Sequence, residues 1–176
     1  MDKKDRDYRG SIYTYIARRS LESRLKGTTF TLPRDLPAVL RQPGAAFVTL
    51  KKGGVLRGCI GTISPTKETL AEEIATNAIS AALNDSRFPP VSPGEVEMLS
   101  YSVDVLTTPE KVESPAELDP RHYGVIVCSG RRIGLLLPAL EGIDTAEEQL
   151  AIAKEKAGIR PGEKADIFRF TVQRYS

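Results

Sequence analysis

The chain has 176 residues, of which 40% are hydrophobic and 27% charged, and its formal net charge is +2. This length suits one domain with a buried core, and the composition excludes a chain that is disordered throughout or collagen-like. No apolar run approaches the roughly 18–20 residues that a membrane span needs, so no membrane association is predicted.

The first predicted element is a helix over about 8–25, and the charged residues 1–9 before it are expected to fray. The helix has an apolar stripe with charged residues mostly outside it. The stripe consists of Ile12, Ile16, Leu21 and Leu25. Gly27 is a suitable helix end. Three prolines within 33–44 then predict a connector, with one short turn around 38–40.

Two extended runs, 45–51 and 55–61, flank Gly53 and Gly54 and predict a β-hairpin. A long helix is predicted over about 66–85, with its acidic residues near the N-terminus, where the helix dipole favours them. The S-x-x-E spacing that begins at Ser92 is typical of a capping box and predicts one short helix.

The remaining half of the chain predicts more strands than helices. A strand over 98–107 has an apolar face, and Asp104 on its other face is expected to be an exposed strand residue, with an acid lining a groove as the alternative. A second hairpin is predicted from the runs 123–128 and 133–137. A helix over 146–157 with a capping box at Thr145 and a terminal strand over 165–174 complete the chain.

These elements are arranged as hairpins rather than as βαβ units. About six strands and three substantial helices therefore predict an α+β fold, with a mainly antiparallel sheet and flanking helices in a single domain. The sequence shows no internal repeat.

Cysteine and histidine usage limits the chemistry. Cys59 and Cys128 are far apart and form no C-x-x-C pair, which fits a reducing cytoplasm. Residues 1–7 lead into no continuous apolar segment, which argues against a secretory signal. His122 is the single histidine, so a closed zinc site is not predicted, although a carboxylate-built metal site stays open. No cofactor is predicted.

The segment 56–62 is the most informative. Strand alternation directs Arg57 and Cys59 to one face and Leu56 and Ile60 to the other. A guanidinium that bends toward a thiol favours the reactive thiolate. The neighbouring glycines, Gly58 and Gly61, permit close approach by a ligand or by another backbone. The alternative is structural, because a free cysteine often packs as a small hydrophobe and strand glycines often mark tight packing.

A second cluster follows the long helix. Arg87 complements the dipole at a helix C-terminus, and Phe88 packs there as an apolar cap. The functional alternative is that Arg87 binds an anion, or pairs with Asp85 to line a pocket next to Cys59. Both interpretations stay open.

Other polar and aromatic residues are weaker candidates. His122 is predicted in an exposed loop, and Cys128 in the core. Arg131 and Arg132 lie at the tip of the second hairpin, where solvation competes with an anion or partner contact. Tyrosines near the N-terminus are expected to be core or surface anchors rather than a base-stacking platform, namely Tyr8, Tyr13 and Tyr15.

The segment 56–62 is similar to the hallmark of the AMMECR-one domain family. Segments 85–90, 102–107 and 136–138 agree in order and spacing, and the resemblance covers roughly 10–175. It implies two α+β lobes with a groove between them and the hallmark near that groove. Relatives of this size look like protein A of the microbial AmmeMemoRadiSam system, alongside a Memo-like protein and a radical SAM protein.

The chain departs from some relatives at one position. A His-Gly pair opens their strand where this chain has Tyr123 and Gly124, and His122 lies one residue earlier. A shift of one residue turns a side chain to the opposite face of a strand. A Cys–His dyad is therefore not predicted here.

Three functions follow as hypotheses. The first is an accessory or binding component that acts with Memo-like and radical SAM partners through the groove around residues 57–61. The second is an enzyme with Cys59 as nucleophile on a small electrophilic substrate, for which no general base is evident. The third is nucleotide or RNA binding, which 23 acidic residues against 25 basic ones and the absence of a known motif disfavour. A small-molecule ligand stays open.

Overall fold

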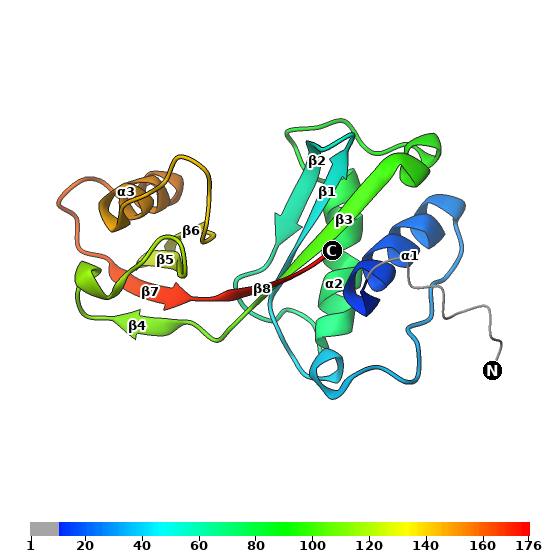
Figure 1. The fold of residues 1–176 in the computed structure, drawn as a ribbon, viewed down its shortest axis with the longest axis horizontal. Helices are drawn as coiled ribbons and strands as arrows, with labels where there is room; N and C mark the ends of the chain where they lie inside the picture. Colours follow the sequence, from blue (N-terminus) through cyan, green and yellow to red (C-terminus); the bar gives the residue numbers. More distant parts are fainter. Residues whose placement is uncertain (1–10) are drawn as a thin grey trace. The chain divides into compact units, whose positions relative to one another are not determined.

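The computed structural model describes residues 11–176, so the predictions for residues 1–9 and Tyr8 lie outside the described residues. The chain divides into two compact units (Figure 1). The first unit comprises the chain up to Val105 together with Gln173–Ser176, and the second comprises Leu106–Val172. Residues 11–176 include no helix that is both long and apolar enough to cross a bilayer.

The first unit contains a four-stranded sheet in the order β2-β1-β3-β8. These strands are β1 (Ala46–Lys52), β2 (Val55–Gly61), β3 (Leu99–Leu106) and β8 (Val172–Tyr175). The helices α1 (Ile12–Lys26) and α2 (Leu70–Leu83) pack against each other, and α2 covers β1 and β2 (Figure 1). The short helices are η2 (Ala38–Arg41) and η3 (Pro93–Met98). The centre of the core is fully buried and includes Ile16, Leu21, Val48, Leu50, Ile74 and Val103.

The hairpin of β1 and β2 is confirmed. Gly53 and Gly54 have φ angles of 57° and 82°, a left-handed conformation that favours glycine in the tight turn. The antiparallel register pairs Val48 with Ile60 and Thr49 with Cys59. Val48 and Ile60 face the core, so Cys59 lies on the opposite face of the sheet.

The predicted start of the long helix at residue 66 is wrong, because α2 begins at Leu70. Thr69 forms a capping box with Glu72 there. The preceding backbone is held by Glu73, whose carboxylate accepts the N–H groups of Thr66 at 2.7 Å and Lys67 at 2.9 Å. These bonds wrap the segment around a buried side chain and prevent it from continuing the helix.

The second unit has its own antiparallel sheet, in the order β4-β7-β5-β6. Its strands are β4 (Glu110–Val112), β5 (Gly124–Ser129), β6 (Arg132–Leu136) and β7 (Asp166–Phe170). The helix α3 (Ala146–Ala157) packs on β5 and β6, and η4 (Pro115–Glu117) is a single turn. Capping boxes at Thr145 and Ser92 are confirmed.

The α+β class with antiparallel sheets is confirmed, but the strand count was too low. The described residues form eight strands in two sheets. The short β4 was not predicted, and the predicted terminal strand is two strands, β7 and β8. The break falls at Thr171. The Thr107 N–H donates to the Thr171 carbonyl, and the Thr171 N–H donates to the Thr107 hydroxyl.

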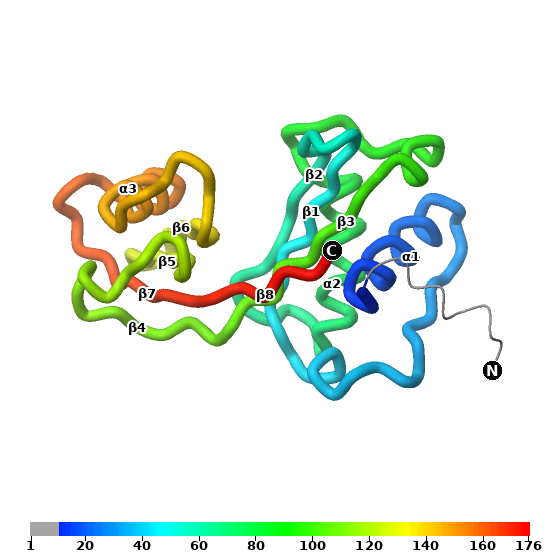
Figure 2. Tube along the Cα trace, in the orientation of Figure 1, coloured from blue at the N-terminus to red at the C-terminus, as the bar shows by residue number. Residues whose placement is uncertain are grey.

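The two units share one arrangement of strands and helix. In each, a hairpin is followed by a capped helix that packs on it, and the next sheet strand after that helix pairs with the first strand of the hairpin. Figure 2 traces the backbone through these elements. The strand orders β2-β1-β3 and β6-β5-β7 correspond. The spacing from Gly58 to Thr69 also equals the spacing from Gly134 to Thr145.

Candidate functional site

Cys59 lies on β2 with its thiol on the face away from the core, and it is half-buried. Its Sγ is 3.3 Å from Oγ1 of Thr49, the residue opposite it on β1. A directly opposed pair on neighbouring strands brings side chains close together, and this explains the contact. The predicted separation of Cys59 from the core-facing Ile60 is confirmed.

Asp85 and Arg87, which follow α2, meet Cys59 directly. The Asp85 carboxylate accepts the Cys59 N–H at 2.9 Å and binds Arg87 through Nε at 2.9 Å and Nη2 at 2.7 Å. Arg87 Nη2 also donates to the Cys59 carbonyl at 3.2 Å. The Arg87 guanidinium, more than any other group, holds the pKa of Asp85 well below its usual range. The structure thus brings these three predicted site residues together.

Arg57 binds the carboxylate of Glu95 rather than a group of the Cys59 cluster. Its Nε and Nη2 donate to the Glu95 carboxylate at 3.2 and 3.3 Å, and Lys52 Nζ donates to the same carboxylate at 3.1 Å. Glu95 also caps η3, and the Arg57 hydrogen bonds are the main reason that its pKa lies far below the ordinary value. The expected bend of Arg57 toward the sulfur is therefore not the arrangement observed. Arg57 joins the hairpin to η3.

The cations that interact electrostatically with Cys59 are Arg87 and Arg174. The pKa of Arg174 is raised mainly by Asp104, and the Cys59 charge adds in the same direction. Arg174 binds Asp104 with two contacts of 2.7 Å. Asp104 is only 1% exposed, so its predicted exposure is wrong: burial is compensated by this bidentate pair. Arg174 was missed, because no sequence motif marks it.

Both hallmark glycines have packing reasons. A Cβ on Gly58 would lie 2.0 Å from the carbonyl oxygen of Ala81 in α2, and a Cβ on Gly61 would lie 2.2 Å from the ring of Phe47. Close approach is therefore used by the chain's own backbone and side chains. Their role in binding stays a prediction.

The weaker candidates lie apart from this cluster. His122 is exposed, with Nδ1 2.7 Å from Asp119 Oδ2. Cys128, predicted in the core, is half-buried, and burial together with Asp166 raises the pKa of its thiol. Arg132 binds Glu163, whereas Arg131 is exposed. Within residues 11–176, no group of three His, Cys, Asp or Glu side chains could hold a metal ion.

The tyrosines serve as anchors, as expected. Tyr13 stacks on Tyr175 of β8 with ring centroids 3.6 Å apart, and Tyr15 meets Phe30 edge-on. The first contact joins α1 to the last strand of the sheet. Neither ring forms part of the Cys59 cluster.

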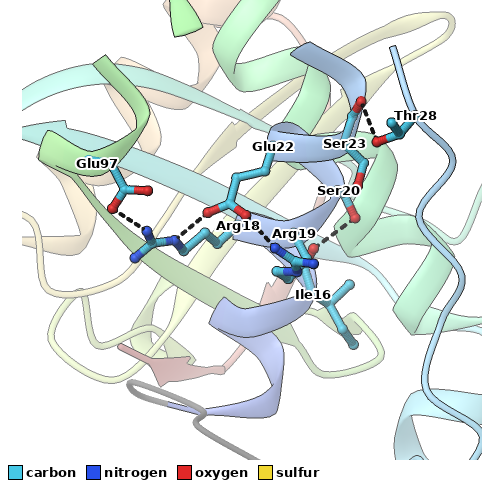
Figure 3. A network of polar contacts seen from close by, with 8 residues as sticks. All are labelled: Ile16, Arg18, Arg19, Ser20, Glu22, Ser23, Thr28 and Glu97. Atoms are coloured by element: carbon cyan, nitrogen blue, oxygen red, sulfur yellow. Dashed lines mark hydrogen bonds and ion pairs between the residues drawn. The ribbon is translucent and has the colours of Figure 1, made fainter. Parts of the chain in front are cut away.

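A polar network on α1 extends to η3 (Figure 3). The nearly buried Glu22 binds Arg18 and Arg19, each at 2.7 Å, and Arg18 reaches Glu97 of η3 at 2.7 Å. Because η3 also carries Glu95, this network links α1 through η3 to Arg57. A separate groove of about 540 Å³ lies between α1, α2 and the segment 28–32, with Phe30, Leu32 and Ile79 in its wall.

Comparisons with known proteins give consistent matches over most of the chain. A Thermotoga maritima protein is 55% identical over 82% of this chain and 83% of its own length. The solved structure of the uncharacterised protein PH0010 from Pyrococcus horikoshii has a TM-score of 0.85 at 37% identity, covering 94% of this chain and 89% of that one.

A longer relative also matches. The Clostridium acetobutylicum protein CA_C1420 is 48% identical over 93% of this chain, but the match spans only 35% of its own length. The chain thus corresponds to about a third of that protein. A family model described as AMMECR1 matches residues 14–175.

Proposed function

The chain belongs to the AMMECR1 family, and from this premise we propose that it is an accessory binding component that presents the region around residues 57–61 to a partner protein. The resemblance suggests a Memo-like protein and a radical SAM protein as partners. The site residues in this proposal are Arg57, Gly58, Cys59, Gly61, Asp85 and Arg87.

One observation carries the proposal: the charged groups around Cys59 are already bound by partners within the chain. Asp85 receives four hydrogen bonds, and Arg57 is bound to Glu95. Among the described residues, the polar side chain within hydrogen-bonding distance of the thiol is the Thr49 hydroxyl, and no histidine, lysine or free carboxylate contacts it. A surface whose charged groups are already paired suits recognition better than proton transfer, which needs a positioned acid or base.

The Clostridium relative supports the same proposal. A region matching nearly all of this chain occurs there within a protein about three times as long. A domain that is fused to additional sequence in a relative is suited to act next to another domain. The identity of that module remains part of the proposal.

The test is co-expression of the tagged chain with the Memo-like and radical SAM proteins of the same organism, followed by size-exclusion chromatography. We expect a complex that Cys59→Ser leaves nearly intact and that Thr49→Lys, which places a cation beside Cys59, weakens at least tenfold. Glu147→Lys on the exposed side of α3 is the control and should not change it. No complex with either partner, or a complex indifferent to Thr49→Lys, contradicts the proposal.

A second candidate is nucleophilic chemistry at Cys59. The observation in its favour is that the Cys59 thiol lies on the face of the sheet away from the core and is only half-buried, as a nucleophile requires. A small electrophile would then form a covalent adduct on Sγ. Mass spectrometry of the chain purified from its host should show such an adduct on Cys59 and none on Cys128. A complete loss of cellular function in a folded Cys59→Ser variant that still binds its partners would favour this candidate over the first.

A further inference from the structure

We infer that Asp85 and Arg87 are positioning residues for Cys59, acting as a clamp on its backbone and a control on its thiol. The strand β2 lies at the end of its sheet, and within residues 11–176 it pairs with β1 alone. The Cys59 N–H donates to Asp85, and the Cys59 carbonyl accepts from Arg87. Two side chains from one short segment thus bind both polar groups of a single residue's backbone.

The second unit shows that the hairpin and helix do not need this clamp. Leu135 follows Gly134 as Cys59 follows Gly58, and β6 also lies at the end of its sheet. Among the described residues, no side chain hydrogen-bonds the backbone of Leu135, yet the same hairpin and helix form. The clamp therefore accompanies the cysteine and not the fold.

Asp85 and Arg87 differ in exposure, and this difference indicates different roles. The Asp85 side chain is 5% exposed and is a fixed anchor, whereas the Arg87 side chain is 56% exposed and bonded on one side. The clamp holds the β2 backbone so that Sγ stays opposite Thr49, and it keeps the Arg87 guanidinium on the carbonyl of the same residue. A cation near a thiol favours the thiolate, and an anion opposes it.

The two residues therefore have opposite expected effects on the reactivity of Cys59. Removing the positive charge with Arg87→Gln should lower the thiolate fraction at neutral pH. Removing the negative charge with Asp85→Asn should raise it, since the asparagine oxygen can still accept the Cys59 N–H. A purely structural role would instead shift both variants in the same direction.

The experiment measures iodoacetamide alkylation of Cys59 against pH, in a Cys128→Ser background, by intact-mass spectrometry. For Arg87→Gln we expect about a threefold slower rate at pH 7 and a profile displaced to higher pH, as one screened charge near a partly exposed group produces. Asp85→Asn should be faster than the parent. Arg87→Lys should recover most of the rate, and Arg132→Gln in the second unit should leave it unchanged.

Unchanged profiles in Arg87→Gln, or equal displacements in the two variants, overturn the inference. If Asp85→Asn does not fold, the Arg87→Gln and Arg87→Lys pair decides, because charge alone should restore the rate. The assay uses the isolated chain without a partner, so it does not depend on the proposed binding function. A positive result with no partner complex would keep the clamp and reject that function.

Discussion

The two hairpin-and-helix units differ most where a polar side chain enters the layer between helix and sheet. In the first unit, Glu73 is almost fully buried and accepts four hydrogen bonds from Thr62, Thr66 and Lys67. At the matching position of α3, Gln149 donates to the Tyr123 carbonyl, and its Oε1 has no partner among the described residues. The hairpin and helix thus form with either side chain at this position, so the four hydrogen bonds of Glu73 are not a requirement of the shared arrangement.

The sides of α2 and α3 that face away from their sheets also differ between the two units. Ala71 and Ala78 are completely buried in α2, because α1 packs on that helix. The matching residues of α3 are Glu147, which is exposed, and Lys154, which is half-buried. Within the described part of the second unit, no other α-helix is present to cover them. A helix side that meets solvent carries charges, whereas one that meets another helix has small residues that allow close approach.

The largest effect that tests the shared plan is expected at the two strand glycines. A Cβ on Gly58 or on Gly134 would lie 2.0 Å from a helix carbonyl oxygen, and backbone cannot move aside as a side chain can. Gly58→Ala and Gly134→Ala should each lower the free energy of unfolding by about 3 kcal/mol. Urea denaturation measures this. Gly94→Ala, whose Cβ would meet nothing within 4 Å, is the matched control. Tolerance of alanine at one glycine but not at the other would break the equivalence.

A smaller effect is expected where the units differ. Glu73→Gln replaces an acceptor with a group that is half donor, and the lost bonds should cost about 2 kcal/mol at pH 7. Burial raises the pKa of Glu73, but its hydrogen bonds outweigh this and leave the pKa below the ordinary value of 4.5. The stabilisation is thus complete above pH 4.5 and is lost as the pH falls through the folded-state pKa.

Denaturant titrations at several pH values should therefore show the gap between parent and Glu73→Gln closing below about pH 4.5. Gln149→Glu is the reciprocal variant. It places a carboxylate beside the Tyr123 carbonyl and should destabilise the chain at neutral pH and recover in acid. A gap for Glu73→Gln that is the same at all pH values would show that shape, not charge, accounts for this position.

The smallest effect is expected at the helix caps, which the units share. Thr69→Ala and Thr145→Ala each remove a side chain that accepts a backbone N–H, and each should cost about 1 kcal/mol. Serine at either position keeps the hydroxyl and is the control. Thermal unfolding followed by circular dichroism resolves the difference. Similar losses at both caps would sharpen the correspondence, and a loss at only one would weaken it.

Local features of this chain were predictable from its sequence. Turn glycines, capping boxes and alternation predicted both hairpins, α3, and the opposite faces of Cys59 and Ile60. Proline and glycine positions act within a few residues, so their consequences do not depend on tertiary packing.

Long-range partners were not predictable in the same way. The partner of Arg57 is Glu95, which the sequence marked only as a capping residue, and Asp104 is buried because Arg174 from the last strand reaches it. The start of α2 was misplaced for a similar reason, since Glu73 binds the backbone before the helix. The shared arrangement of the two units was also not predicted, because it depends on strand order and few identical residues mark it.

The clamp on Cys59 also affects how copies of this chain meet one another. A terminal strand with free N–H and carbonyl groups is a template on which another chain can extend the sheet. At Cys59 these groups are already occupied by Asp85 and Arg87. The same pair that binds the Cys59 backbone thereby removes this residue from the part of β2 on which the strand of another molecule could pair.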